Sequence, residues 1–579
     1  MVTNKKNTIE KNWQILPQIT EDFSAKFPEI NPVILQLLFN RDLDNQEKID
    51  QFLNPDYGSD LYDPFLFSEM EKVVKRIFLA IEKQEKIVVY GDYDADGVCS
   101  SVVMVETLKN FGAQVEVYIP FRETEGYGLN LAAAKELINQ GVNLVITVDC
   151  GISNKNEVEL LNQGGVDVII TDHHHQPLEL PKAFAIINQN LTREKYPFKK
   201  LAGCGVAFKV VQGLITKQAE YKIKQLPEGF EKWLLDLVAI GTIADLQPLL
   251  GENRILVKYG LVVLNKTKRL GILKLIEKIG NHVTVIDERM VGWQISPRLN
   301  AAGRLNHASS AYQLLLTENA AEADQLAIEI NQTNQQRQQI TDKINLEAKE
   351  KIGKVDKQKI LIVVGENWPT GVVGLVAGRL TDNHHLPSLV ISRYNGEIIG
   401  SGRSIAEFNL IEAIQKCDEC LSRYGGHGQA AGFTLKDEKS LAKFIEKITK
   451  LAETKLKEKE LKPILEIDSE INLNQLDWQL VEEIEKFIPY GEENPKPKFL
   501  IKDLTIIDCQ LVGQDGKHLR LTIGDDQISK KAIGFSFGEW FSRIKKGDKI
   551  DLISEIEINE WNGNRELQLK IVDLRQSHS

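Results

Sequence analysis

The stretch Ile87-Val88-Val89-Tyr90-Gly91-Asp92-Tyr93-Asp94-Ala95-Asp96-Gly97 leads from four apolar residues into three aspartates flanked by glycines. A short apolar run that ends at a glycine predicts a buried strand. Residues 99–111 follow with an apolar pattern of helical length. A strand, an acidic turn and a helix in this order predict the first half of a βαβ unit.

The same alternation continues on the C-terminal side of that stretch. We expect strands at residues 115–119, 144–148 and 166–170, and helices at residues 131–139 and 156–163. Strands that alternate with helices of this length are typical of a parallel sheet whose two faces are covered by helices.

A second α/β block is expected from residue 359 to about residue 451, preceded by a long helix. The segment from Ala320 to Lys354 is rich in Ala, Glu, Gln and Ile, and as one helix it would be about 50 Å long at 1.5 Å per residue. A charged segment at residues 455–462, which we expect to be helical, closes this block.

The C-terminal part of the chain changes to short strands. Residues 518–523 and 566–571 alternate between polar and apolar side chains, which predicts strands. Asn562-Gly563, just before the second of them, is a strong hairpin signal. Such strands favour a small barrel, and among small barrels we expect an OB-fold.

The predicted fold class is therefore α/β, with two α/β domains joined by a long helix and followed by an OB-type β-barrel. The expected parts are an N-terminal helical region (residues 1–70), a first α/β domain with a parallel sheet (71–309), the connecting helix (310–354), a second α/β domain (355–455) and the barrel (463–579).

Four acidic clusters occur in the first α/β block, each where a strand or helix gives way to a loop. They are Asp92 to Asp96, Asp149, Asp172-His173-His174 and Asp245. The first three follow predicted strands, whose carboxyl ends border the ligand crevice of an open α/β sheet. We therefore expect these side chains to lie close together.

Like charges gathered in one crevice need a cation to neutralise them. Carboxylate oxygens with imidazole nitrogen are ligands that suit Mn²⁺ or Mg²⁺. A lone aspartate at a strand end is most often a turn residue or a helix cap. Three aspartates within five residues, together with Asp-His-His at another strand end, make the metal interpretation much the better one.

Composition sets limits without identifying a function. At 579 residues the chain is too long for one core. Six scattered cysteines, no secretory signal and no apolar run of about 20 residues predict a cytoplasmic protein that does not enter a membrane. The net charge of −11 argues only weakly against nucleic-acid binding, because a carboxylate-rich metal site can mask a basic groove.

The acidic motifs resemble those of the DHH phosphoesterase superfamily. The segments at residues 120–129 and 296–304 resemble its RecJ branch, and Gly425-Gly426-His427-Gly428-Gln429 resembles the signature of the associated DHHA1 domain. Pro489-Tyr490-Gly491 and residues 495–497 are similar to the OB domain of that branch. The resemblance runs from about Met70 to the C-terminus.

This resemblance implies a centre with two metal ions. Asp94 and Asp149 would hold one ion. The other ion would be held by Asp96, Asp149, His173 and Asp245. A bridging Asp149 would allow the ions to lie about 3.5–4 Å apart, which suits phosphoryl displacement. His174 would protonate the leaving oxygen or stabilise developing charge, and Asp172 would orient the histidines.

One position departs from the superfamily pattern. Many members have a metal-ligating histidine where this chain has Tyr90. Asp92 can take its place as a ligand, or water can. The first metal site is therefore expected to be the weaker of the two.

The resemblance also implies a binding pocket for the 5′ end of the substrate. Its expected members are Arg122, Arg304, Ser401, Arg403 and His427. Glycines around His427 would let backbone amides approach a phosphate closely. Taken without the resemblance, these arginines can equally be solvated surface residues, and the glycines can simply form tight turns.

The implied activity is 5′→3′ exonucleolytic hydrolysis of single-stranded DNA to 5′ mononucleotides, in recombination and repair. The implied partners are single-strand-binding protein and a RecQ-type helicase, and a monomer is expected. Two alternatives stay open: a phosphodiesterase of the same superfamily that acts on short oligonucleotides or cyclic dinucleotides, and a non-catalytic DNA-binding scaffold. The complete set of acidic motifs favours catalysis over the scaffold.

Overall fold

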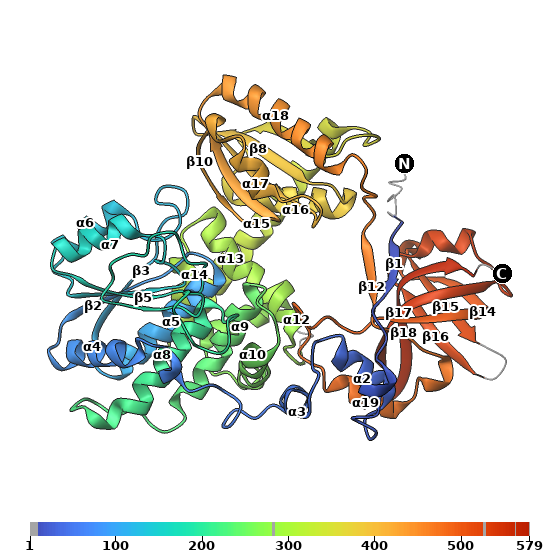
Figure 1. The fold of residues 1–579 in the computed structure, drawn as a ribbon, viewed down its shortest axis with the longest axis horizontal. Helices are drawn as coiled ribbons and strands as arrows, with labels where there is room; N and C mark the ends of the chain where they lie inside the picture. Colours follow the sequence, from blue (N-terminus) through green and yellow to red (C-terminus); the bar gives the residue numbers. More distant parts are fainter. Residues whose placement is uncertain (1–9, 281–283, 525–527, 562, 578–579) are drawn as a thin grey trace. The chain divides into compact units, whose positions relative to one another are not determined.

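The computed structural model describes residues 10–280, 284–524, 528–561 and 563–577 (Figure 1). The chain divides into two compact units. The first comprises residues 1–10, 62–247 and 256–463, and the second comprises residues 11–61, 248–255 and 464–579. Among the described helices, none combines the length and the apolar character needed to cross a membrane.

The first unit contains the predicted parallel sheet. Its strand order is β3 (Gln114–Tyr118), β2 (Lys86–Tyr90), β4 (Leu144–Val148), β5 (Asp167–Thr171) and β6 (Ala185–Ile187), and all neighbours run parallel. Every residue of β4 is buried, as expected for a central strand covered on both faces.

Helices cover both faces of this sheet, as Figure 1 shows. One face carries α4 (Met70–Glu82), α5 (Ala95–Asn110) and α8 (Gly203–Lys217), and the other carries α6 (Leu131–Asn139) and α7 (Lys155–Gln163). The α/β prediction for this block is confirmed.

A helical region follows the sheet in the chain. Its helices are α9 (Leu235–Ala244), α10 (Gly251–Leu264), α11 (Leu270–Ile279), α12 (Glu288–Met290), the π-helical turn η4 (Val291–Ile295), α13 (Ser296–Leu305) and α14 (Ser309–Leu316). The long helix α15 (Ala320–Ile352) comes next and has 33 residues. At 1.5 Å per residue it is about 50 Å long, the length expected from the sequence.

The second α/β block has a mixed sheet of strand order β10 (Leu421–Gly426), β11 (Ala430–Leu435), β9 (Glu397–Arg403), β8 (Ser388–Tyr394) and β7 (Leu361–Glu366). Its helices are α16 (Thr370–His384), α17 (Leu410–Gln415) and α18 (Glu438–Leu456). The expected helical linker at residues 455–462 is wrong, because α18 ends at Leu456. Leu456 is the last buried residue of the apolar stripe of α18. The charged residues that follow it offer no apolar face that a longer helix could pack against the domain.

The second unit holds the predicted barrel. Its strands are β13 (Ser469–Glu470), β14 (Phe499–Val512), β15 (His518–Gly524), β16 (Ser529–Gly534), β17 (Lys549–Trp561) and β18 (Asn564–Gln576). The sheet closes because β14 pairs with both β15 and β17. Of the predicted hairpin residues, Asn562 lies outside the described residues, and Gly563 has the positive φ of 79° that such a turn needs.

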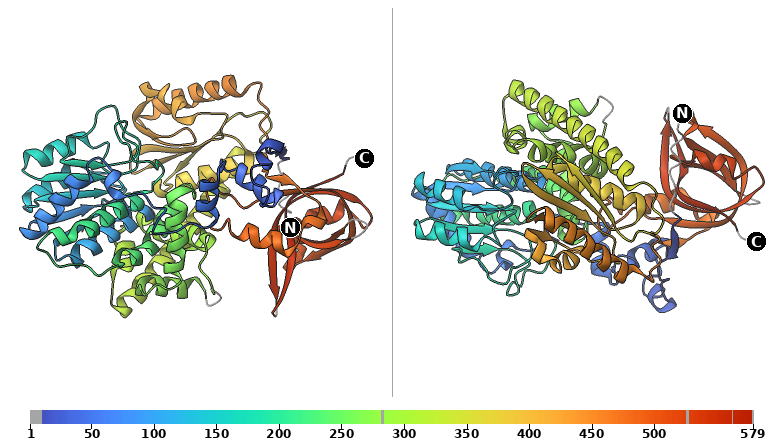
Figure 2. Two further views of the ribbon diagram at one scale, coloured as in Figure 1. Left: turned by 60° about the horizontal axis from the view of Figure 1, so that its bottom comes forward. Right: turned by 90° about the horizontal axis from the view of Figure 1, so that it is seen from above.

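The N-terminal helices share the core of this barrel. Phe23, Leu35 and Phe52, the last from α3 (Gln46–Leu53), belong to the same apolar cluster as residues of β14 and β15. The buried Arg254 binds this part of the chain together, since its guanidinium donates to the carbonyl oxygens of Phe52 (2.9 Å) and Phe487 (2.8 Å). Both views of Figure 2 show these helices beside the barrel.

Candidate active site

Asp92, Asp94 and Asp96 lie where β2 passes into α5. Asp94 caps the helix, because its Oδ1 accepts the backbone N–H groups of Asp96 (2.9 Å) and Gly97 (3.0 Å). The Asn300 side chain of α13 accepts the N–H of Ala95 at 2.8 Å. These bonds fix the loop, so that its carboxylates are held in place by the first turn of α5.

Asp96 is buried at the N-terminus of α8. Its oxygens accept the N–H groups of Gly203 (2.7 Å) and Cys204 (3.0 Å). Burial, together with the nearby Asp94, raises the pKa of Asp96 to about 6 despite these bonds. Space for the carboxylate depends on Gly241, since a Cβ there would lie 2.6 Å from Asp96 Oδ1.

Asp149 follows β4 with a left-handed backbone (φ 60°) that turns its side chain into the site. Burial raises the pKa of Asp149 well above its ordinary value, and the carboxylates of Asp96 and Asp94 raise it further. Its Oδ1 is buried and accepts no hydrogen bond from the described residues, and the same is true of Asp92 Oδ1. Two such oxygens in one site fit a cation that is to be bound there.

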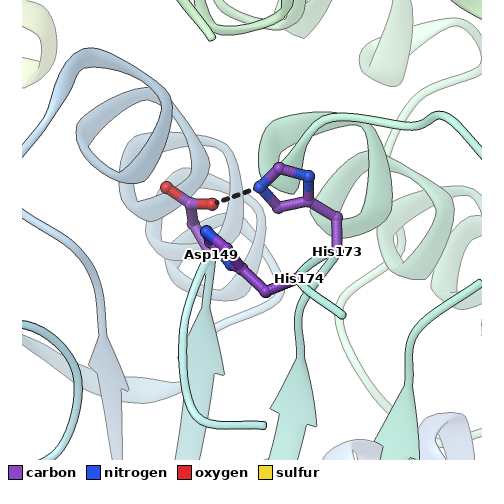
Figure 3. Close-up of side chains that lie close together, drawn as sticks. All are labelled: Asp149, His173 and His174. Carbon is purple, nitrogen blue, oxygen red and sulfur yellow. Dashed lines mark ion pairs between the residues drawn. The ribbon is translucent and has the colours of Figure 1, made fainter. Parts of the chain in front are cut away.

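His173 lies opposite Asp149, as Figure 3 shows. Its Nε2 is 3.0 Å from Asp149 Oδ1 and 3.6 Å from Asp245 Oδ2. Burial, with His174 nearby, lowers the pKa of His173 to about 4. The imidazole is therefore neutral at pH 7, which is the form that can donate a nitrogen lone pair to a metal.

Asp245 follows the last residue of α9, and Gln247 Nε2 donates to its Oδ2 at 2.8 Å. Burial raises the pKa of Asp245 to about 8, and Asp96 and Asp94 contribute to the shift. A carboxyl group of this kind releases its proton readily only when a cation replaces it.

Three groups of side chains bring their ligand atoms within 4.8 Å of one another. They are Asp92 with Asp94 and Asp149, Asp96 with His173 and Asp245, and Asp149 with His173 and His174. Asp149 and His173 each belong to two groups, so the three form one continuous cluster. The structure thus brings together every residue for which the sequence predicted a metal-binding role.

Tyr90 contributes no ligand atom to these groups. Its hydroxyl donates to the carbonyl oxygen of Gly128 at 3.0 Å, and its ring stacks on Tyr118 at a centroid distance of 4.9 Å. Asp92 occupies the metal-facing side of the loop instead, in the group with Asp94 and Asp149.

His174, which belongs to the third of these groups, forms a pair with Asp172. His174 Nδ1 lies 2.7 Å from Asp172 Oδ1, and Asp172 also accepts the N–H groups of His173 (2.7 Å) and Ile152 (2.9 Å). Burial alone would lower the pKa of His174, but the hydrogen bond to Asp172 and the negative charges of Asp172, Asp245 and Asp92 together raise that pKa to about 9. His174 is therefore an imidazolium at pH 7, and it has a proton to give.

The predicted arginines form a second cluster. Arg304 is partly buried, and the desolvation of its guanidinium, together with the positive charges of Arg122, Arg337 and Arg403, lowers its pKa to about 10. Its Nη1 donates to the carbonyl oxygen of Gly371 at 3.1 Å. The charges of three arginines thus act on Arg304, and guanidinium groups gathered in this way have the chemistry that suits a phosphate group.

The remaining predicted residues lie on the second α/β block of the same unit. Arg403 Nη1 donates to Gly402 O (2.8 Å) and lies 3.4 Å from Ser401 Oγ. The ring of His427 meets the ring of His175 at a centroid distance of 5.9 Å. His175 directly follows His174 in the chain, so the His427 loop is close to the metal cluster.

Sequence reasoning missed three residues of this site. Tyr127 Oη lies 3.0 Å from His174 Nδ1 and 3.1 Å from the carbonyl oxygen of Asp149, to which it can donate. Asn300 holds the acidic loop, and Arg337 joins the arginine cluster from α15. Tyr127 and Asn300 lie inside the family segments, which was a usable signal, whereas Arg337 looks like any polar residue of a long helix.

Three family models match the chain. Residues 86–242 match the N-terminal domain of the DHH family, residues 357–454 match the DHHA1 domain, and residues 467–573 match the RecJ OB domain.

Curated relatives extend the match over almost the whole chain. The single-stranded-DNA-specific exonuclease RecJ of Bacillus subtilis is 40% identical over 547 residues, which cover 94% of this chain and 68% of the relative. The protein of the same name from Haemophilus influenzae is 33% identical, over 93% of this chain and 96% of the relative.

Solved structures agree with this. The crystal structure of RecJ from Thermus thermophilus in complex with Mn²⁺ matches with a TM-score of 0.83 at 28% identity, over 98% of this chain and 80% of that one. A crystal structure of exonuclease RecJ bound to manganese matches with a TM-score of 0.60 at 32% identity, over 69% of this chain and 99% of that one. From the identity and coverage of these relatives, the chain belongs to the RecJ family of DHH phosphoesterases.

Proposed function

We propose that this chain is a metal-dependent, single-stranded-DNA-specific exonuclease that digests strands from the 5′ end and releases 5′ mononucleotides. The proposal rests mainly on the continuous cluster in which Asp149 and His173 each belong to two groups of potential ligand atoms. Membership of the RecJ family supports the choice of single-stranded DNA as the substrate.

The cofactor in this proposal is Mn²⁺ or Mg²⁺, with two ions. Asp92, Asp94 and Asp149 would hold one ion, and the residues for the other would be Asp96, Asp149, His173 and Asp245. The buried Oδ1 of Asp92, which accepts no hydrogen bond from the described residues, and the approach of His173 Nε2 to Asp149 Oδ1 support this fit. When bound, such ions supply Lewis-acid chemistry that activates water and neutralises charge on the phosphate.

The protein residues supply the proton and the alignment. Water adds to the phosphorus of the second nucleotide, and the bond to the 3′ oxygen of the first nucleotide breaks. The imidazolium of His174 is placed to give that oxygen its proton, while the carboxylate of Asp172 keeps the ring charged and oriented. Tyr127 Oη contacts the same ring nitrogen, Nδ1, and helps to fix the position of the His174 ring.

The arginine cluster would hold the terminal 5′-phosphate. Its proposed members are Arg122, Arg304, Ser401, Arg403 and His427. Each hydrolysis leaves a new 5′-phosphate on the remaining strand, so one pocket can engage every successive end. This supports digestion from the 5′ end, one nucleotide at a time.

In this proposal the protein acts as a monomer in the cytoplasm, in DNA recombination and repair. A RecQ-type helicase would produce the single strands that this enzyme digests, and single-strand-binding protein would cover them. Both partners follow from the substrate, because a single-strand-specific enzyme needs unwound DNA.

The test uses 5′-phosphorylated single strands labelled at either the 5′ or the 3′ end, beside the same sequence as a blunt duplex, with Mn²⁺ or with EDTA. The proposal expects mononucleotides from the 5′ label at once, shortening of the 3′-labelled strand, and no product from the duplex or with EDTA. Release of the 3′ label first, or turnover of dinucleotides alone, would refute it.

A further inference from the structure

Two large apolar side chains of the first unit are exposed, and one of them directly follows a residue of the metal cluster. Leu246, which directly follows Asp245, is 73% exposed, and Trp293 is 78% exposed. By contrast, Leu249, three residues after Leu246, is 2% exposed. The exposure of Leu246 is thus confined to the turn next to the site.

The two residues belong to elements that pack together. Gly292, next to Trp293, packs against Ile243, because a Cβ on Gly292 would lie 3.5 Å from Ile243 Cγ2. Ile243 precedes Asp245 by two residues in α9. At its C-terminal end, η4 continues into α13, which carries Asn300 and Arg304. The turn η4, which carries Trp293, therefore packs on the helix that ends at Asp245 and leads into the helix that carries Arg304.

The backbone is irregular at both positions. Leu246 has φ 55°, a left-handed conformation that a bulky side chain rarely adopts. Trp293 lies in a single π-helical turn, a feature found mostly where a function requires it. An irregular backbone that presents a large exposed apolar side chain, found at two positions on packed elements next to the site, is the observation on which the following inference rests.

We propose that Leu246 and Trp293 form a base-contacting surface, on which unpaired bases of the DNA strand stack as its backbone passes the metal cluster. This inference rests on the proposed function and deepens it. An indole ring and a leucine side chain offer an apolar face to any base without reading its sequence. In a duplex the faces of the bases are stacked and paired, so this surface selects single strands.

The experiment scans a 5′-phosphorylated 20-nucleotide strand with one abasic nucleotide placed at each of the first eight positions. KM is measured with Mn²⁺, and binding of the same strands is measured by fluorescence anisotropy in EDTA. The proteins are the wild type, Trp293→Ala, Leu246→Ala and Leu246→Gly. Leu246→Gly removes the side chain and also relieves the left-handed backbone. Trp233→Ala is the matched control, because Trp233 is also exposed (51%) and lines a different part of the first unit.

We expect Trp293→Ala to raise KM and to weaken binding on the intact strand about tenfold. In the wild type, an abasic nucleotide at one or two adjacent positions should have the same effect. At those positions, Trp293→Ala should raise KM no further once the base is missing. The abasic nucleotide should also raise KM less in both Leu246 variants than in the wild type. Trp233→Ala should keep the wild-type profile.

The proposal is overturned if Trp293→Ala binds and digests the intact strand within twofold of the wild type. It is also overturned if the abasic profile is unchanged in that variant. Binding in EDTA needs no hydrolysis. A wild-type protein that binds strands but does not cut them would therefore contradict the proposed function alone. The anisotropy profile would still decide whether Leu246 and Trp293 contact bases.

Discussion

His174 Nδ1 lies 2.7 Å from the buried Asp172 Oδ1, and this bond, with the charges of Asp172 and of nearby carboxylates, raises the pKa of the imidazole to about 9 against the effect of burial. The same carboxylate accepts the backbone N–H of His173, which faces the metal cluster. One aspartate thus links the acid that we assign to the leaving oxygen with a candidate metal ligand.

Asp172→Asn should remove the negative charge of this side chain and keep its size and shape. Without the carboxylate, the pKa of His174 should fall toward its ordinary value near 6.5, and kcat should fall about 100-fold at pH 8. The descending limb of the kcat profile should move from about pH 9 toward pH 7. The control is Asp382→Asn, an exposed aspartate on α16. A reduced kcat with an unmoved limb would show that Asp172 does not set the pKa of His174.

Tyr127→Phe removes one hydroxyl that contacts both His174 and the backbone of Asp149. The loss of one or two ordinary hydrogen bonds predicts a kcat that is about 3- to 10-fold lower, with little change in KM. Tyr394→Phe, in the second α/β block, should have no effect. A larger change in KM than in kcat would assign Tyr127 to strand binding rather than to the position of His174.

Arg337→Ala should weaken recognition of the terminal phosphate. Its Nε is buried and has no hydrogen-bond partner among the described residues, and its charge acts on Arg304. KM for 5′-phosphorylated strands should rise about tenfold, with less change for strands that end in a 5′-hydroxyl. Arg337→Lys should recover part of the loss, and Arg393→Ala, at an exposed ion pair, should change neither KM. An equal loss on both kinds of end would contradict a phosphate role.

Metal-free protein should lose stability between pH 6.5 and 8.5. The folded-state pKa is raised to about 8 for Asp245 and to about 9 for His174, so the folded protein holds protons in this range that the unfolded chain releases. The stabilisation is fully present below the pKa values of the unfolded chain and is lost as pH rises through those of the folded protein. The loss is roughly 1.4 kcal/mol per pH unit for Asp245, and less for His174, whose side chain is partly exposed to solvent.

Thermal unfolding in EDTA across that range measures this effect. Mn²⁺ should reverse the slope, because it binds the deprotonated carboxylates. Asp245→Asn should flatten the slope in EDTA, since one of the titrating groups is gone. A melting temperature that does not change with pH in EDTA would contradict the assigned shifts.

The sequence predicted the sheet of the first unit well, because its signal is local. Strand β4 and helix α6 begin and end at the expected residues, since a fully apolar strand and an apolar helical stripe are each visible within ten residues. The metal candidates were found for a similar reason: parallel strands end at one edge of a sheet, so motifs at strand ends meet.

Other features depend on contacts between distant segments, which local patterns do not contain. Nothing in residues 11–61 shows that Phe23 and Phe52 pack into the barrel core more than 400 residues away in the chain. Arg337 lies on a helix where a polar residue usually faces solvent, and only the fold brings it to Arg304. The charged composition after Leu456 predicts a helix. The segment has no stripe of buried apolar residues that would hold such a helix in place.

The most direct test of the central claim is Mn²⁺ binding and strand digestion by Asp149→Asn, measured by calorimetry and by release of 5′ mononucleotides. Asp149 is shared between two groups of ligand atoms, so this variant should lose most Mn²⁺ binding and at least about 1,000-fold in kcat, while it melts at or above the temperature of the metal-free wild type. If Asp149→Asn binds Mn²⁺ and digests single strands as the wild type does, the cluster is not the catalytic centre.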